Sequence, residues 1–541
     1  MKLRKQDQEF RNPKVFYPDP KNVDLDRVLI NLFLLLRCDG TRPATRGRAK
    51  AEFEQVRAHV ETLAAMPGVT GVLENKEIAQ QWLETDIFDL VNRNRPTEAI
   101  ASLRPLHLDA HKIRVSKYCR DYNHADALYA MLEHGDRQAL VDLRKYLERG
   151  RDPATGRFDG ATHLDLETLT VLKLVEDLPN MHPSGEKVAS FAPVCVGQSR
   201  ILGDDVQRLL AYQDVIPRPV MIDYLKAIFG LHIGLFTLRV GRQLSGWVKD
   251  RAPNTKCQSC PVQGAAAEPF QDCPYQLSFT VDMGSDFRTR MAQLAQQDAA
   301  SEYSGLIHLV KSIFSVNQLL RYAQEEKLGT SPAEVVALLT DPPDGFEADF
   351  KAQLKELRRL NEDNEEMPLE VQSILDAGLP PFDTFIEIVS HIRQKHHMTY
   401  LVQMLDKLFQ KNSSFGALIQ GRSKANPRRW HLGGRLLEVF VQLAVLRADG
   451  EGIGRQFSTE PMLIDDFLRW IERRYGFVIG PSTLSGRKPT TLDEHRAFRE
   501  NLRALKDRLR EIGFYDDLSD AYNAQTVKPR YILTQHDFAN D

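Results

Sequence analysis

The 541-residue sequence has few cysteines, little excess of either charge and no apolar run long enough to cross a bilayer. Six cysteines in a chain of this length argue against a disulfide-stapled secreted scaffold. Lys and Arg total 71 against 74 Asp and Glu, which excludes a histone-like polycation and leaves nucleic-acid contact to a local patch. The longest apolar stretches, residues 28–36 and 227–238, fall short of the roughly 20 residues of a spanning helix. We expect both to be buried core helices.

The signatures of well-known catalytic sites are also missing. The sequence contains no GxxxxGK[ST] phosphate loop, no GxSxG nucleophile elbow, no HExxH metal motif and no kinase signature set. Residues 1–14 are charged and lack the apolar segment of a secretory signal. We therefore expect a soluble, cytoplasmic protein that does not contact a membrane, and the residue patterns alone name no reaction.

What is present is mostly helical periodicity, which predicts a mainly α, multi-domain protein. An irregular stretch after residue 180 and a clear helix start at residue 331 suggest three domains, at residues 1–180, 181–330 and 331–541. In the last domain we expect helices near residues 432–447, 460–475 and 493–512, followed by a short strand. That order resembles a winged-helix layout.

The strongest local signal is a cysteine motif in a non-helical insertion at residues 249–285, with the spacing Cys257-x2-Cys260-x12-Cys273. Two thiolates in one tight turn can hold a single soft metal ion, so the motif predicts a structural metal knuckle. Zinc is preferred, with an iron–sulfur cluster as the lesser alternative. A closed site needs a fourth ligand, and the sequence offers Cys195, Cys119, Cys38 or a histidine such as His232. Three unpaired cysteines in a loop, or a redox or iron-sensing role, remain the alternatives.

The second signal is electrostatic. Residues 407–437 contain no Asp or Glu, and the helix expected at 493–512 carries cations on one face. Such patches can contact the phosphates of duplex DNA, and a tryptophan within one can stack on a base. The predicted nucleic-acid-binding residues are Arg422, Lys424, Arg428, Arg429, Trp430, Arg435, Arg499, Arg503 and Lys506. An acidic protein partner and a plain solvated face are the other interpretations.

A third basic stretch covers residues 37–50, where cations including Arg42 surround Pro43 and Gly47. The pattern predicts a loop between two helices. A solvated loop is the default interpretation, and phosphate binding is the alternative.

As a whole, the chain resembles accessory components of bacterial anti-phage defence operons of the methylation-associated type. The segments that carry the resemblance are KCQSCPVQGAAAEPFQDCP, PVMIDYLKAIFGLHIGLF and LREIGFYDDLSDAYNAQTVKPRY. The resemblance implies a non-enzymatic partner of methyltransferase, nuclease, kinase and ATPase subunits, and it assigns no role to individual residues.

These observations lead to two hypotheses of different classes. The first is a non-catalytic, DNA-associated or scaffold subunit of an antiviral defence assembly, because local basic patches occur without catalytic signatures. The second is a divergent metal-dependent nuclease or other enzyme, whose carboxylates would come from distant segments and escape a motif search.

Overall fold

The computed structural model describes residues 2–43, 53–66, 68–91, 99–361, 368–423, 425–449, 455–481, 489–515 and 525–534. The prediction of a mainly helical protein is confirmed, because long helices account for most of this part of the chain. The helices are α1 Leu25–Arg37, α2 Phe53–Ala64, α3 Lys76–Trp82, α4 His124–Gly135, α5 Arg137–Leu147, α6 Leu166–Val175, α7 Val196–Leu210, α8 Arg218–Asp250, α9 Thr255–Gln258, α10 Arg290–Glu325, α11 Pro332–Ala337, α12 Phe346–Arg359, α13 Leu369–Asp376, α14 Pro381–Leu408, α15 Gly434–Ala444, α16 Ile464–Tyr475 and α17 Leu492–Glu511. Short turns of other helix types lie at Lys5–Gln8, Leu83–Ile87 and Leu108–Lys112.

Strands within these ranges occur only as two-stranded pairs. The antiparallel pairs are β1 Phe88–Leu90 with β2 Ile100–Leu103, β4 Leu418–Ile419 with β5 Arg429–Trp430, β6 Leu446–Asp449 with β7 Gln456–Thr459, and β8 Met462–Leu463 with β10 Thr526–Val527. The single parallel pair joins β3 Phe279–Thr280 to β9 Phe477–Val478. It fastens the segment that follows the cysteine motif to the C-terminal third of the chain.

Several helix boundaries follow from local chemistry that the sequence displays. Asp24 caps α1 by accepting hydrogen bonds from the first backbone N–H groups. Ser331 and Glu334 form the reciprocal capping box that starts α11. At the other end of a helix, Gly476 terminates α16 with a φ of 84°, which only glycine adopts without strain.

Helix α8 is the core helix that its apolar sequence predicted. By length and composition the whole helix could cross a membrane, unlike the shorter run at residues 227–238 on which the prediction was based, but 83% of its most apolar window is buried inside the protein. Gly230 and Gly234 let α14 and the residue after it approach closely. A Cβ on Gly230 would lie 2.5 Å from the carbonyl oxygen of Leu408, and one on Gly234 would lie 2.6 Å from the ring of Phe409. The Gly-xxx-Gly pair therefore serves helix packing.

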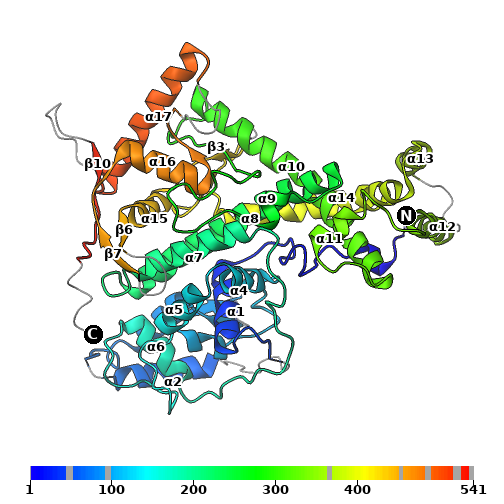
Figure 1. Cartoon of the computed structure of the whole chain (residues 1–541). Coiled ribbons are helices and arrows are strands. Elements are labelled where there is room, and N and C mark those ends of the chain that lie inside the picture. Colours follow the sequence, from blue (N-terminus) through cyan, green and yellow to red (C-terminus); the bar gives the residue numbers. More distant parts are fainter. Residues whose placement is uncertain are drawn as a thin grey trace.

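Helices α7 and α8 lie between the N-terminal and C-terminal parts of the fold (Figure 1). Helices α4 and α5 pack on α7 from one side, and α15 packs on both α7 and α8 from the other. The long helices α10 and α14 pack on α8 and on each other. One hydrophobic core contains residues from all three predicted domains, running from Phe10 to Leu533. The domain boundaries stay a prediction.

The C-terminal helices match the expected ranges closely as α15, α16 and α17. The strand expected after the last helix is β10, and it pairs back to β8 immediately before α16. The winged-helix layout itself stays a prediction.

Candidate metal centre and basic surface

The fold packs the segment that carries the motif against the start of α7, where a fourth cysteine lies. Cys257 lies in the short helix α9, Cys260 follows it by less than one turn, and Cys273 lies in the irregular chain before β3. Cys195 is the residue that caps α7, far upstream in sequence. All four are free thiols.

The cysteine segment is fastened to the first turns of α7. The sulfur of Cys260 lies 3.2 Å from the position of a Cβ on Gly197, only two residues after Cys195. Arg200 on α7 donates hydrogen bonds to the carbonyl oxygens of Cys260, at 3.0 Å, and of Val262, at 2.7 Å. The loop therefore presents its thiols to the N-terminal end of α7.

The four thiols influence one another electrostatically. Burial raises the pKa of Cys195 to about 12, and the thiols of Cys273 and Cys260 add to the rise against the opposing effect of Arg239. Burial likewise raises the pKa of Cys257 to about 12, followed by the effects of Cys195, Cys273 and Cys260. Burial is thus the dominant influence on both thiols, and the effects of the other cysteines are smaller.

The other candidates for a fourth ligand are engaged elsewhere. The Cys119 thiol neighbours Asn31, and Cys38 lies near the backbone of residue 181. His232 uses one ring nitrogen with Asp205 and the other with Gln198, each at 2.8 Å. Of these candidates, Cys195 is the one whose neighbour Gly197 contacts the motif segment, and its role as a ligand stays a prediction.

The structure does not gather the four thiols at metal-bond distance. Across the part of the chain that the structure describes, no three His, Cys, Asp or Glu side chains form a ready-made metal site. A metal ion would have to draw the thiols inward. The irregular chain around Cys260 and Cys273 makes such a movement local, and metal binding commonly completes the folding of segments of this kind.

Arg239 is a buried cation at this site without a carboxylate partner. The side chain, 2% exposed, donates to the carbonyl oxygen of Tyr275 at 2.8 Å and lies 3.9 Å from the sulfur of Cys273. Its guanidinium carbon lies 3.7 Å from the centroid of the Phe270 ring. No ion pair to Arg239 occurs among the described residues.

A desolvated arginine without a counter-charge is costly. Burial lowers the pKa of Arg239, and the thiols of Cys195 and Cys273 oppose that shift. Metal-bound thiolates would supply the missing negative charge, and sulfur donors are the type that soft metals prefer. The metal itself stays a prediction.

A buried ionic network lies next to the segment that carries the cysteines. Asp205 on α7 accepts hydrogen bonds from His232 at 2.8 Å, from Tyr475 at 2.7 Å and from the Nε of Arg474 at 2.8 Å. Arg474 also bonds Asp204 at 2.8 Å and the carbonyl oxygen of Gly264 in the cysteine segment at 2.9 Å. The network therefore links α7, α8 and α16 to the segment that carries the thiols.

The network keeps its carboxylates ionised. Burial works against ionisation of Asp204, but Arg474 and Arg208 outweigh it and lower the pKa to about 2. Arg474 and His232 likewise lower the pKa of Asp205 against the effect of burial. No local sequence pattern predicts this network, because Arg474 lies far from Asp204 and Asp205 in the sequence. The adjacent acids Asp204 and Asp205 do not by themselves indicate a buried ion pair.

The predicted basic loop is largely inside the protein. Trp430, in β5, is fully buried, and its ring packs on Phe279 and Phe409 with centroids 4.5 and 5.1 Å away. Arg429 is also fully buried, and its Nε lies 3.1 Å from Asp282. The expectation that Trp430 stacks on a base and Arg429 contacts a phosphate is therefore corrected, because neither side chain reaches the surface.

The other predicted DNA-binding residues of that loop differ in whether an acidic side chain already pairs with them. Arg428 makes two hydrogen bonds of 2.8 Å with Asp406, and Arg435 makes one of 2.9 Å with Glu438. Arg422 is exposed, and Lys424 lies outside the described residues. The window without acids thus obtains counter-charges from outside it.

Helix α17 keeps its predicted cations accessible. Arg499 and Arg503 are exposed, while Lys506 is half-buried and hydrogen-bonded to Gln525. No ion pair to Arg499 or Arg503 is found among the described residues. Of the predicted DNA-binding residues, Arg422, Arg499 and Arg503 are therefore exposed and free to contact a partner.

Comparison with known families then identifies the chain. The family of methylation-associated defense system protein MAD7 matches residues 5–531. No curated protein and no solved structure matches the chain significantly. The resemblance stated from three short segments is confirmed over nearly the whole sequence, and the chain belongs to the methylation-associated defense system protein MAD7 family.

Proposed function

We propose that this chain is a non-catalytic structural subunit of the methylation-associated defence assembly, with a metal centre at Cys195, Cys257, Cys260 and Cys273. The observations behind the proposal are the contact of Cys260 with α7 two residues after Cys195, and the buried Arg239, which has no carboxylate partner among the described residues and lies beside Cys273. The subunit would act in the cytoplasm and bind other components of the system. It would contact duplex DNA through the exposed face of α17.

The role of the metal would be structural. Four thiolates favour zinc, with an iron–sulfur cluster as the alternative. When bound, the metal would supply the cross-link that fixes the segment between α8 and β3 onto α7. The chain's own residues hold the same segment through Arg200 and Arg474, which bond the carbonyls of Cys260 and Gly264. The metal would reinforce an anchorage that is already present.

The ionic network supports a structural role. Asp204 and Asp205 are each engaged by Arg474, and His232 has both ring nitrogens bonded. Groups that satisfy one another in this way stabilise a particular packing of helices. A subunit whose interior is held so firmly is suited to positioning partners.

Metal content tests the centre directly. The purified full-length protein should contain one zinc per chain, and Cys195→Ser and Cys257→Ser should each lose it. Cys38→Ser is the matched control, because Cys38 is buried but lies away from the other thiols. A brown protein with visible absorption would indicate that an iron–sulfur cluster, and not zinc, occupies the site. A full-length protein without stoichiometric metal would overturn the centre.

Association with DNA is tested by duplex binding across a salt series. Affinity should fall steeply with salt if several phosphates are neutralised, and R499E/R503E should weaken it strongly. The control R137E/K145E reverses two exposed cations on α5. Equal binding by both variants would show that α17 does not contact the DNA. Protein partners should then be sought by co-purification.

The nuclease alternative makes a separate prediction. If the chain cleaved DNA, plasmid and linear duplex would be cut in the presence of divalent metal, and EDTA would abolish the cut. Cleavage by the pure protein, lost on EDTA treatment, would overturn the non-catalytic assignment.

A further inference from the structure

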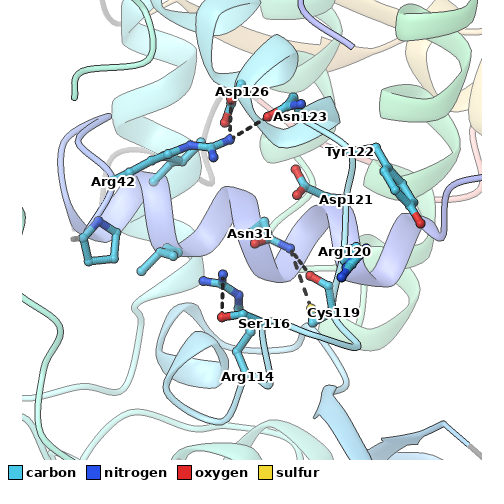
Figure 2. A pocket seen from close by; sticks show the side chains of 13 residues that line it. Asn31, Arg42, Arg114, Ser116, Cys119, Arg120, Asp121, Tyr122, Asn123 and Asp126 are labelled. Carbon is cyan, nitrogen blue, oxygen red and sulfur yellow. Dashed lines mark hydrogen bonds and ion pairs between the residues drawn. The ribbon is translucent and has the colours of Figure 1, made fainter. Parts of the chain in front are cut away.

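A cavity of about 440 Å³ lies in the N-terminal part of the fold and belongs to none of the sites above. It is bounded by α1, the chain just after α1, the loop before α4 and the first turn of α4 (Figure 2). The volume falls within the range of about 300–1,000 Å³ typical of small-molecule sites. A cavity of this size is much larger than one inorganic ion requires.

Two arginines for which the described residues provide no ion pair line the cavity. The Nε of Arg114 is buried without a hydrogen-bond partner, and its Nη2 reaches only Ser116, at 3.3 Å. Arg120 is exposed at the same cavity. No ion pair to Arg114 or Arg120 occurs within the described ranges. Figure 2 shows both side chains among the labelled residues around the cavity.

The acidic groups at the cavity are already engaged. Asp126 pairs with Arg42, and Arg11 lies 3.5 Å from the same carboxylate. Asp121 accepts a hydrogen bond of 3.0 Å from the backbone N–H of Ala125 in the first turn of α4. Because three arginines line the cavity against the two carboxylates Asp121 and Asp126, the lining carries a surplus of positive charge.

The nearby thiol does not cancel this surplus. Burial raises the pKa of Cys119 to about 12, so the thiol is neutral near pH 7. Burial also lowers the pKa of Arg114, and the effects of Cys119 and Asp121 oppose that shift only in part. An anion bound at this point would relieve the cost of burying the charge.

We propose that this cavity binds a small organic phosphate, with the phosphate held by Arg114 and Arg120. The aliphatic carbons of Leu34, Leu35 and Pro43 also line the cavity and would contact the apolar or aromatic body of the ligand. A nucleoside monophosphate has this combination of a phosphate monoester and a flat organic body. The guanidinium groups recognise the phosphate because their planar donors match its oxygens.

The site is independent of the metal centre. It uses residues of the N-terminal helices, whereas the cysteines lie on α7 and the segment after α8. Loss of metal from Cys195→Ser and loss of phosphate binding are therefore separable results.

Titration calorimetry of the full-length protein with AMP, adenosine and inorganic phosphate tests the proposal. AMP should bind more tightly than adenosine or phosphate. R114Q and R120Q should each weaken AMP binding by about ten- to hundredfold, because each removes charge-assisted hydrogen bonds. R120Q alters an exposed side chain and keeps the test valid if R114Q fails to fold.

R137Q is the matched control, because it removes an exposed arginine from α5 outside the cavity. Its affinity for AMP should equal that of the parent protein. Absence of AMP binding, equal binding of phosphate and AMP, or unchanged affinity in both R114Q and R120Q would each overturn the proposal.

Discussion

The sulfur of Cys260 lies against Gly197, 3.2 Å from the point where a Cβ would project from that glycine. The side chain of Val262 is closer still, at 2.8 Å. Gly197→Ala would therefore push the cysteine segment away from α7. We predict that this variant loses the metal of the proposed centre, or binds it with less than one equivalent, as measured by elemental analysis of the purified protein.

The control for this change is Gly305→Ala. Gly305 lies in α10, and nothing lies within 4 Å of the position of its Cβ. Alanine should stabilise α10 by up to about 1 kcal/mol because of its higher helix propensity. Full metal content in Gly197→Ala would show that the contact with α7 is not needed to bring the thiols together.

Arg474 is the second point at which the fold can be tested, because its side chain is buried and holds two carboxylates. Arg474→Ala should cost about 3–5 kcal/mol, since it strands Asp204 and Asp205 without their main cation. The change should appear as a large drop in the thermal midpoint. Arg469→Ala, which removes an exposed cation paired with Asp466 on the same helix, should cost about 0–1 kcal/mol. Equal midpoints for the two variants would contradict the importance of the network.

His397 predicts how stability depends on pH. Burial lowers its pKa to about 3, with smaller contributions from Arg393 and His396, and its ring stacks on Phe10 with centroids 4.3 Å apart. In the unfolded chain the imidazole has a pKa near 6.5, whereas in the folded chain it binds a proton only near pH 3. The contribution is therefore intact above pH 6.5 and is lost progressively as the pH falls toward 3.

His397→Phe removes this proton linkage and keeps an aromatic ring against Phe10. Between pH ~7.5 and ~5 the parent should lose about 2 kcal/mol through this group, and the variant should lose correspondingly less. The measurement is the difference in thermal midpoint between the two pH values. His163→Gln controls for the loss of one histidine, because His163 is exposed. The same difference in all three proteins would refute the assignment.

Local signals in the sequence were enough to predict most of the helices. The apolar run of α8, the helix start at residue 331 and the helix expected near residues 460–475 each depend on neighbouring residues, and each is found where the pattern predicted it. Cys257 and Cys260 are also a local signal. Cys195 is not, because its proximity depends on how α7 packs against a segment more than 60 residues later. Long-range packing of this kind leaves no periodicity to detect.

The same distinction explains the basic loop. An absence of acids within residues 407–437 suggested free cations, but the counter-ion of Arg429 is Asp282, which comes from the segment that precedes α10. Charge counted along a window cannot include partners supplied by tertiary structure. The aromatic residue in that window was predicted to stack on a base, and instead Trp430 completes the core between Phe279 and Phe409.

The basic loop therefore predicts a stability effect rather than a binding effect. R428E/R429E would place one carboxylate beside Asp406 and another beside Asp282, with the second fully buried. Burying an unpaired charge costs several kcal/mol, so the thermal midpoint should fall sharply and soluble yield should drop. R422E reverses an exposed cation of the same loop and should leave the midpoint unchanged. A folded R428E/R429E protein with a normal midpoint and weakened DNA binding would instead restore this loop as the DNA-contacting surface.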